Sequence, residues 1–328
     1  MERPITRADE REQVYEERLQ TLSDGAVRRN FDPYQDIDWD APENEIRYDD
    51  ERWILGEWDP LGRHEWYKSL PKDEQIRIGI HRFALMSKVG LQFEQGLVAG
   101  IMLSNVESNQ TNEIRATTHE SVEEGNHILM FNELVRRTGI DTMGAPSKFR
   151  KQIPIVTALG TKFPALFWFG VLAGEEPIDH TQKEVLRNSA NVHPLMARIM
   201  AIHVAEEARH ISLAHEKLKV EVPKMSRLGR AALAVMVPGL MIQLARIIAK
   251  PSRKECAAMG IPPEVAEEVW GKSAESRKYW ADLFPDTRML ADELGLRKGN
   301  LLGRLAWKAW GIDGRASRYR GEPDRRHK

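Results

Sequence analysis

Apolar side chains recur along most of this chain at intervals of three to four residues, the spacing of helices that bury one face. Stretches that alternate apolar and polar residues are few, and no Asn-Gly or Asp-Gly pair joins two of them. Because strands and hairpins leave those two signals, their scarcity argues against a sheet. The pattern therefore predicts an all-α protein.

Four long helices are predicted in the middle of the chain, at about 72–106, 116–138, 165–188 and 195–220. Glycine and proline residues break the pattern over 139–164, where we expect a crossover that contains a short helix. Gly90 and Gly96 leave room for an interruption of the first long helix. Further helices are expected at about 1–29, 225–250 and 263–295.

Composition narrows the class of protein. The chain of 328 residues can bury a sizeable core, and its formal net charge of −1 gives no general attraction to nucleic acid. A single cysteine, Cys256, excludes an intramolecular disulfide, a cysteine-rich zinc site and a built-in iron–sulfur cluster. The charged N-terminus shows no apolar signal region, so we expect a cytoplasmic protein.

Two segments in the C-terminal third of the chain say less about the class of protein. The uncharged run 231–245 is too short to span a bilayer and contains Pro238, so we expect no membrane span there. Core packing or a homodimer contact explains this run equally well. The tail from Leu301 is basic and is expected to be solvated.

The chain contains two related segments, each with a Glu-x-x-His pattern. They are HESVEEGNHILM at 119–130 and IHVAEEARHISL at 202–213. Aligning His127 with His210 also aligns Glu124 with Glu207. A single acid-x-x-His match is expected about once by chance in a chain of this composition. The repetition, rather than either match alone, makes the pattern informative.

Two further glutamates precede the Glu-x-x-His motifs at nearly equal distances, and they strengthen the interpretation of the repeat as functional. Glu94 stands 30 residues before Glu124, and Glu176 stands 31 residues before Glu207. The midpoint of each gap falls in a predicted connection between two helices. Two antiparallel helices that are joined at such a midpoint bring the flanking residues to the same height. We therefore expect Glu94 to face the first Glu-x-x-His pair and Glu176 to face the second.

One glutamate from each of two helices, with Glu-x-x-His from each of two others, is the carboxylate-bridged two-metal arrangement of four-helix bundles. Residues three apart project from one helix face, so a carboxylate can bridge two ions while the imidazole binds one. Oxygen and imidazole ligands suit iron or manganese. The competing interpretation is a set of surface ion pairs, but apolar neighbours would bury these acids, and unpaired buried carboxylates are costly without metal.

Further polar residues lie near these motifs. His203 stands four residues before Glu207 on the same helical stripe and is expected to be a third imidazole ligand, or else a core histidine. Asp179 and His180 lie one turn beyond Glu176 and are expected to orient ligands or to lie at the surface. Glu120, which aligns with His203, is a further candidate for orienting a ligand.

The sequence resembles a known family, the AurF-like p-aminobenzoate N-oxygenases, in four segments within residues 75–250. The segments are FEQG, THESVEEGNHILMFNEL, GEEPIDHTQ and VHPLMARIMAIHVAEEARHISLA. The resemblance implies a single domain with a ferritin-like diiron four-helix core at about 75–250, an N-terminal extension over 1–74, and C-terminal helices and a tail over 251–328. It implies as iron ligands Glu94, Glu124, His127, Glu176, His203, Glu207 and His210. Glu175 is an alternative to Glu176, which the 31-residue offset favours.

The resemblance also implies an activity. Members of the family are non-haem diiron oxygenases in which a peroxo-diiron intermediate oxygenates an arylamine, so the expected partners are O2, a small-molecule substrate and a separate electron donor. Manganese in place of iron stays open. The best-studied members bind a substrate carboxylate through an arginine about a turn and a half before the first glutamate. In this sequence that stretch, ALMSKVGLQFE, has no arginine, and Lys88 is the nearest cation.

Two other functions use the same bundle. An acyl desaturase or hydroxylase also shows two such motifs but needs only two histidine ligands, so His203 argues against it. A ferroxidase-type iron-binding protein is a further alternative, although ferritin subunits are about half as long as this chain. A helical scaffold without enzymatic activity is a last alternative. Iron content separates the scaffold from the three iron proteins, cage assembly identifies a ferritin, and substrate oxidation under O2 identifies an oxygenase.

Overall fold

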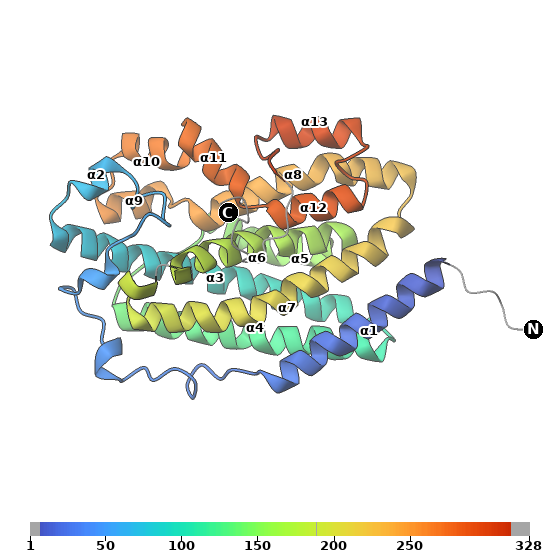
Figure 1. The fold of residues 1–328 in the computed structure, drawn as a ribbon, viewed down its shortest axis with the longest axis horizontal. Coiled ribbons are helices and arrows are strands. Elements are labelled where there is room, and N and C mark those ends of the chain that lie inside the picture. Colours follow the sequence, from blue (N-terminus) through green and yellow to red (C-terminus); the bar gives the residue numbers. More distant parts are fainter. Residues whose placement is uncertain (1–6, 188, 316–328) are drawn as a thin grey trace, which may run out of the picture.

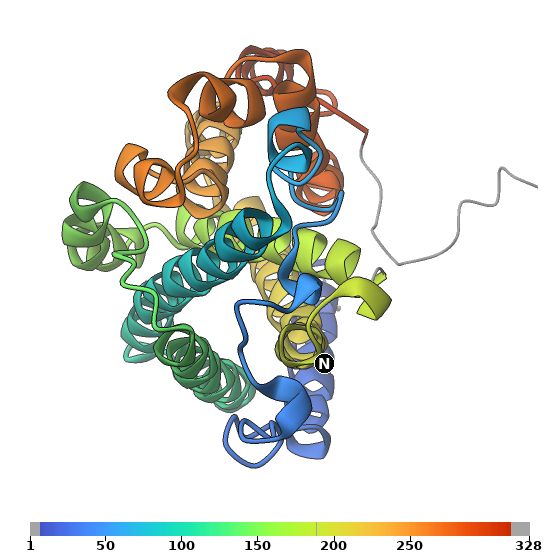
Figure 2. The same ribbon diagram turned by 90° about the vertical axis from the view of Figure 1, so that its left-hand side faces the viewer.

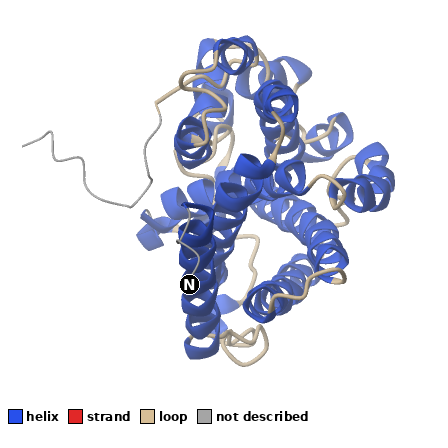
Figure 3. Cartoon of the chain, turned by 90° about the vertical axis from the view of Figure 1, so that its right-hand side faces the viewer, coloured by secondary structure: helices blue, strands red, loops and turns tan. Residues whose placement is uncertain are grey.

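The computed structural model describes residues 7–187 and 189–315. Over these ranges the chain forms helices and loops and no strand, which confirms the all-α prediction (Figure 3). The helices are α1 (Arg7–Arg28), α2 (Glu65–Lys68), α3 (Lys72–Asn105), α4 (Thr111–Thr138), α5 (Ser147–Gly160), α6 (Pro164–Arg187), α7 (Pro194–Lys224), α8 (Arg227–Ala249), α9 (Arg253–Met259), α10 (Pro263–Trp270), α11 (Ala274–Asp282), α12 (Pro285–Glu293) and α13 (Leu301–Ala309). Short 3₁₀ turns lie at Pro42–Asn44, Glu51–Trp53 and Ser189–Asn191.

The long helices α3, α4, α6 and α7 form the central bundle (Figure 1). Helix α3 packs chiefly on α4, and α6 packs chiefly on α7, so each pair is an antiparallel hairpin. The two connections lie at 106–110 and 188–193, where the sequence predicts them. Helix α1 covers α4 and α7 on one side, and α8 covers α6 on the other. The four bundle helices agree with the predicted ranges to within about five residues.

Helix α3 is continuous, and its glycines serve close packing instead of an interruption. A Cβ atom at Gly90 would lie 3.3 Å from the ring of Phe131, and one at Gly96 would lie 2.8 Å from a methyl group of Ile153. Each glycine therefore lets a side chain from another helix approach the α3 backbone. The interruption of this helix that the two glycines left open does not occur.

The C-terminal part differs from its prediction in two ways. Residues 263–295 form three short helices instead of one, because Gly271 ends α10, Ser273 caps α11 and Pro285 begins α12. The basic tail begins as helix α13, which packs on α8 and buries Trp307. Residues 316–328 lie outside the described part of the chain.

Helix α5 stands to one side of the bundle, as the end-on view shows (Figure 2). Its only buried residue is Thr157. Helices α8 and α9 form a stretch, Arg227–Met259, that is long and apolar enough to cross a membrane by length and composition alone. Of its most apolar window, 44% is buried inside the protein, and the core helix of a soluble protein meets the same criterion, so this stretch does not show a membrane span.

Candidate metal centre

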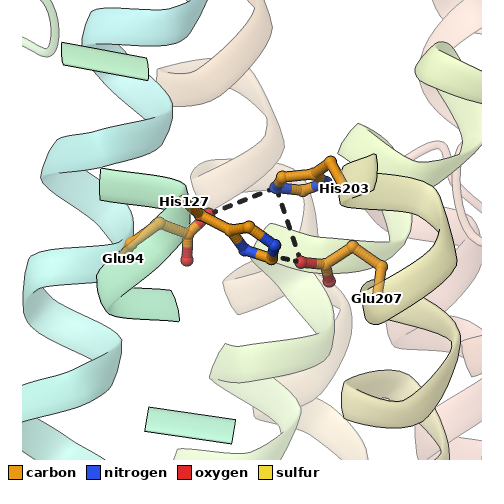
Figure 4. A group of neighbouring side chains, drawn as sticks. All are labelled: Glu94, His127, His203 and Glu207. Atoms are coloured by element: carbon orange, nitrogen blue, oxygen red, sulfur yellow. Dashed lines mark ion pairs between the residues drawn. The ribbon is translucent and has the colours of Figure 1, made fainter. Parts of the chain in front are cut away.

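Buried carboxylates and imidazoles converge halfway along the central bundle. Two groups of side chains each offer ligand atoms within 4.8 Å of one another. The first consists of Glu94 from α3, His127 from α4, and His203 and Glu207 from α7 (Figure 4). The second consists of Glu124, His127, Glu207 and His210. Because the groups share His127 and Glu207, they form one cluster with room for two neighbouring ions.

Two carboxylates occupy the middle of this cluster. Glu124 lies 3.0 Å from His127 Nδ1 and 2.9 Å from His210 Nδ1. Glu207 lies 3.6 Å from His127 Nδ1, 3.4 Å from His210 Nδ1 and 3.5 Å from His203 Nε2. His203 Nε2 also lies 3.7 Å from Glu94. Glu124 and Glu207 therefore stand where bridging carboxylates of a two-metal site would stand, with histidines on either side.

The cluster carries more negative charge than its imidazoles can balance. Burial, together with the negative charge of Glu124, raises the pKa of Glu94 and of Glu207 above the ordinary range. Burial opposes ionisation of Glu124 too, but His210 and His127 hold its pKa well below the usual value. Burial lowers the pKa of His127, yet the attraction of Glu124 outweighs it and raises that pKa to about 9.

Several polar atoms of the cluster have no hydrogen-bond partner among the described residues. Both oxygens of Glu207 and both nitrogens of His203 are in this state. Burial and the nearby His127 lower the pKa of His203 well below its ordinary value, so this imidazole is neutral and can offer a lone pair. Buried polar groups are normally satisfied, and unsatisfied carboxylates beside neutral imidazole suit divalent cations. The residues present thus fit a two-metal site.

Glu175, and not Glu176, faces this cluster, which corrects the preference derived from the 31-residue offset. The Glu175 carboxylate is buried with both oxygens unpartnered among the described residues. Burial and the neighbouring charges of Glu207 and Glu120 raise its pKa. Glu176 points the other way and accepts hydrogen bonds from the backbone N–H of Asp286 (2.7 Å) and of Thr287 (3.0 Å), and from the Thr287 hydroxyl. It satisfies donors of the first turn of α12.

Glu120 belongs to the cluster, and its position explains the repeat further. Both of its oxygens are buried without hydrogen-bond partners among the described residues. Burial raises its pKa, which the charge of His210 opposes. Glu120 is the counterpart of His203 in the repeat, so the cluster has imidazole at one end and carboxylate at the other. The end near Glu94 contains His203, whereas the end near Glu175 contains Glu120.

The structure does not bring Asp179 or His180 into the cluster. Asp179 forms an ion pair with Lys183 at 2.6 Å, and its other charged neighbour is Asp286. The charged groups that act on His180 are Glu184, Arg187, Asp282 and Lys183. Both residues lie one turn past Glu175 on α6, where they face the C-terminal helices.

A pair of crossed hydrogen bonds orients the two histidines of the repeat. His127 on α4 contacts Glu206 of α7 through Nε2 at 2.9 Å, and His210 on α7 contacts Glu123 of α4 through Nε2 at 2.8 Å. Both histidines therefore turn Nδ1 toward the carboxylates in the middle. Arg209 lies 2.7 Å from Glu123 and 3.7 Å from Glu206, so one cation is placed between the two acids.

These orienting acids could have been found in the sequence. Glu123 and Glu206 occupy equivalent places in the repeat, each directly before a cluster glutamate. A doubled acid that is conserved between two halves of one chain indicates a shared task. Successive helix residues point about 100° apart, so the first acid of each pair cannot face the metal with the second. It is instead available to the histidine of the neighbouring helix.

Replacing Glu206 by glutamine is expected to weaken metal binding by about 10- to 100-fold, the usual effect of losing an orienting partner. Glu123→Gln should have a similar effect, because it holds His210 as Glu206 holds His127. Competition with a chromophoric chelator measures the affinity. Glu133→Gln is the matched control on α4, since Glu133 pairs with Arg136 and Arg137 outside the cluster. Equal metal affinity in all three variants would refute the orienting role.

An internal cavity of about 50 Å³ lies beside the cluster, between α3, α6 and α7. Phe131 forms part of its wall, and the ring centroid of this residue is 5.1 Å from that of His203. None of the described residues that line the cavity is charged, and Lys88 is not among them. Polar groups come from Ser87, Thr181, Gln182 and Tyr279. The cavity is therefore an apolar chamber with a few neutral hydrogen-bonding groups.

Comparisons with known proteins agree with this geometry. The family described as "P-aminobenzoate N-oxygenase AurF" matches residues 12–295. "Uncharacterized protein MT0908" of Mycobacterium tuberculosis (strain CDC 1551 / Oshkosh) is 49% identical over 314 residues, which cover 95% of this chain and 92% of that protein. "Uncharacterized protein Mb0909" of Mycobacterium bovis is 48% identical over the same share of each chain. No solved structure matches significantly. With the family match spanning nearly its whole length, the chain belongs to the AurF family of p-aminobenzoate N-oxygenases.

Proposed function

We propose that the protein is an O2-dependent diiron oxygenase that oxygenates the nitrogen of a small arylamine. The observation that carries the proposal is the buried cluster of carboxylates and three imidazoles, which lies within a chain of this family. The proposed iron ligands are Glu94, Glu124, His127, Glu175, His203, Glu207 and His210, with Glu120 as a further carboxylate at the Glu175 end. Bound iron would supply O2 activation and the redox change.

The residues of the chain have a separate task from that of the iron. Glu206 and Glu123 hold the protons on the Nε2 atoms of His127 and His210, which leaves the Nδ1 atoms free to bind metal. The surrounding apolar walls exclude water from the reacting atoms. Electrons are proposed to come from a separate reductase in the cytoplasm, because the single cysteine excludes an internal iron–sulfur cluster.

The chamber beside the cluster favours an uncharged aromatic amine over an aminobenzoate. A substrate carboxylate would be buried there without a cationic partner, which is costly. Burial raises the pKa of Tyr279 to about 12, so its phenol stays a neutral hydrogen-bond donor. Three methionines, Met86, Met196 and Met200, line the chamber. Their flexible side chains can shift to admit an aromatic ring into a cavity that is small in this conformation.

The proposal is tested by loading the protein with iron, reducing it without oxygen, and adding ¹⁸O2 together with aniline, 4-aminobenzoate or an acyl substrate. We expect two iron ions per chain and one labelled oxygen on the nitrogen of aniline, with less product from 4-aminobenzoate. Loss of two hydrogens from the acyl chain would support a desaturase instead. Oxidation of the iron with no labelled product from any substrate would support a ferroxidase.

A further inference from the structure

Helices α8 and α13 lie at the side of the molecule opposite α1 and α4 (Figures 1 and 2). Helix α13 packs on α8, and an added Cβ atom at its Gly303 would lie 3.3 Å from the Cβ of Ala234 on α8. Both helices also carry large apolar side chains that are exposed: Leu228, Val235 and Met236 on α8, and Leu301, Leu302, Leu305 and Trp310 on α13. These residues, together with Arg304 and Lys308, are called the α8–α13 surface below.

The exposed side of α13 is an apolar stripe. Leu301, Leu302 and Leu305 fall within about 100° of helical arc, and they are 61%, 57% and 53% exposed. A helix of a globular protein normally turns such a stripe toward the core. Here the buried residues of α13, Gly303 and Trp307, lie on the opposite side of the helix. The leucine stripe therefore faces outward although the helix already has a buried face.

The apolar stripe continues from α13 onto α8. The ring of Trp310 lies against Gly239, where an added Cβ atom would meet it at 3.0 Å, so the exposed faces of the two helices join there. Val235 and Leu228 are exposed within about 40° of Gly239 around the axis of α8, and Leu228 is exposed to 81%. Single exposed apolar residues are ordinary, but a continuous set of them indicates a binding surface.

Both helices lie in segments without acidic residues. Residues 222–254, which contain α8, include seven Lys or Arg and no Asp or Glu, and residues 294–312, which contain α13, include four and none. The whole chain, in contrast, has 48 basic and 49 acidic residues. The near-neutral total thus conceals a local excess of positive charge, and this excess coincides with the exposed apolar stripe.

The cations stand beside the leucines on the same exposed side of α13. Lys308 projects about 20° from Leu301 around the helix axis, and Arg304 projects about 60° from it. Both cations are exposed, and no ion pair joins either of them to a described residue. On α7, in contrast, Lys219 pairs with Glu216 at 3.0 Å. The α8–α13 surface therefore offers apolar contact and unpaired positive charge side by side.

We propose that the α8–α13 surface binds the face of a membrane that contains anionic phospholipids. The leucines and Trp310 would enter the boundary between head groups and acyl chains, while Arg304 and Lys308 would contact phosphate groups. Amphipathic helices bind membranes in this way, and tryptophan favours the interface. The binding is peripheral and not a span, because the inner face of α8 is buried against α6. It is independent of the proposed oxygenase activity.

Two other kinds of partner fit the surface less well. In a two-fold dimer the same surface meets itself, so the cations of one copy would face those of the other, and like charges repel. An acidic protein would neutralise the cations, but its charged surface would also cover the leucine stripe and lose hydration there. A phospholipid layer presents phosphate groups directly beside hydrocarbon, and so it complements both parts of the surface.

Sedimentation of the full-length, metal-containing protein with lipid vesicles tests the proposal. We expect binding to an equal mixture of phosphatidylcholine and phosphatidylglycerol, and much weaker binding to phosphatidylcholine alone. Arg304→Gln combined with Lys308→Gln should weaken binding to the mixture at least about tenfold, since each cation near an anionic surface contributes about fivefold. Lys148→Gln combined with Lys151→Gln is the matched control, because it changes the net charge equally at exposed positions of α5. It should bind as the wild type does.

A second pair of variants tests the apolar stripe. Leu302→Ser combined with Leu305→Ser should weaken binding to the mixed vesicles at least about tenfold, because the leucines no longer enter the hydrocarbon boundary. Leu103→Ser combined with Val106→Ser removes two exposed apolar side chains at the end of α3 and should leave binding unchanged. All the replaced side chains are exposed, so thermal unfolding should show every variant folded.

Several results would overturn the proposal. These include a lack of binding to the mixed vesicles, and equal binding by the wild type and either variant of the α8–α13 surface. A wild-type dimer that Leu302→Ser with Leu305→Ser converts to monomers in the ultracentrifuge, while no vesicle is bound, would assign the surface to a second copy of the chain. Retention on immobilised polyglutamate without binding to vesicles would assign it to an acidic protein.

Discussion

Replacing Glu175 by glutamine is expected to reduce the metal content from two ions per chain to one. The carboxylate lies in the cluster, where burial and the charges of Glu207 and Glu120 act on it. A neutral amide offers a weaker ligand oxygen and removes a negative charge that the ions need. Glu176→Gln, one residue away, should keep both ions, because that side chain accepts hydrogen bonds from α12. Metal analysis after gel filtration measures both contents.

The two variants should also differ in thermal stability: we expect Glu176→Gln, which keeps its metal, to be the one that is less stable than the wild type. Burial raises the pKa of Glu176 to about 8, so its cap on α12 is largely uncharged near pH 7, and the loss of one hydrogen bond there costs about 0.5–1.5 kcal/mol. We therefore expect a lower Tm with full metal content. Glu175→Gln relieves a buried carboxylate in the metal-free protein, so its metal-free form should be at least as stable as the wild type. Loss of an ion from Glu176→Gln but not from Glu175→Gln would show that the cluster assignment is reversed.

Metal removal is expected to make the protein less stable, and increasingly so as the pH rises from 6 to 9. In the metal-free protein, burial raises the pKa of Glu94, Glu120, Glu175 and Glu207 above the unfolded value of about 4.3. A raised pKa means that the folded state binds more protons than the unfolded state. The free energy that each such carboxyl group contributes to folding is fully present below the unfolded pKa and is lost as the pH rises through the folded pKa.

His127 acts in the same direction, because its folded pKa of about 9 exceeds the unfolded value of about 6.5. His210, whose folded pKa is also raised, acts with His127. His203 opposes the trend only near pH 6 to 7, because its folded pKa lies below its unfolded value of about 6.5. Glu124, whose pKa is lowered, stays ionised in both states across this range. Bound cations stabilise the ionised carboxylates and so reverse the trend. Thermal unfolding from pH 6 to 9, with and without metal, should show a gap of at least about 5 °C that widens with pH. A gap that narrows with pH would contradict this charge balance.

The sequence predicts how far along its helix each cluster residue lies, but it does not predict for every residue which way the side chain points around the helix axis. The midpoint argument places a residue along the helix axis, and neighbouring residues differ there by only 1.5 Å. They point about 100° apart around the axis, however, so offsets of 31 and 32 residues before Glu207 select different faces of α6. The sequence therefore leaves both Glu175 and Glu176 at the height of the cluster, and the offset alone does not decide between them. Only the packing of α12 shows which of the two acids faces outward.

The periphery was harder to predict for a related reason. Helices α10, α11 and α12 share one apolar pattern along 263–295, and the caps that divide them act locally. Helix α13 is basic in sequence, yet Trp307 anchors it to α8. Tertiary contacts of this kind outweigh charge and propensity, which a single sequence does not reveal. The motif on α4 and α7 was predictable because the same Glu-x-x-His spacing occurs on both helices and so predicts the same arrangement of side chains twice.

The crossed contacts between His127 and Glu206, and between His210 and Glu123, have a consequence for how the protein matures. Neither motif helix can prepare its own histidine, since each depends on an acid that the other brings. A nascent chain that has made α4 but not α7 therefore holds no competent half-site and cannot trap an ion early. Metal binding therefore requires that residues about 80 apart in the chain have come into contact. A protein that has bound its metal is then one in which α4 and α7 have packed in the correct register.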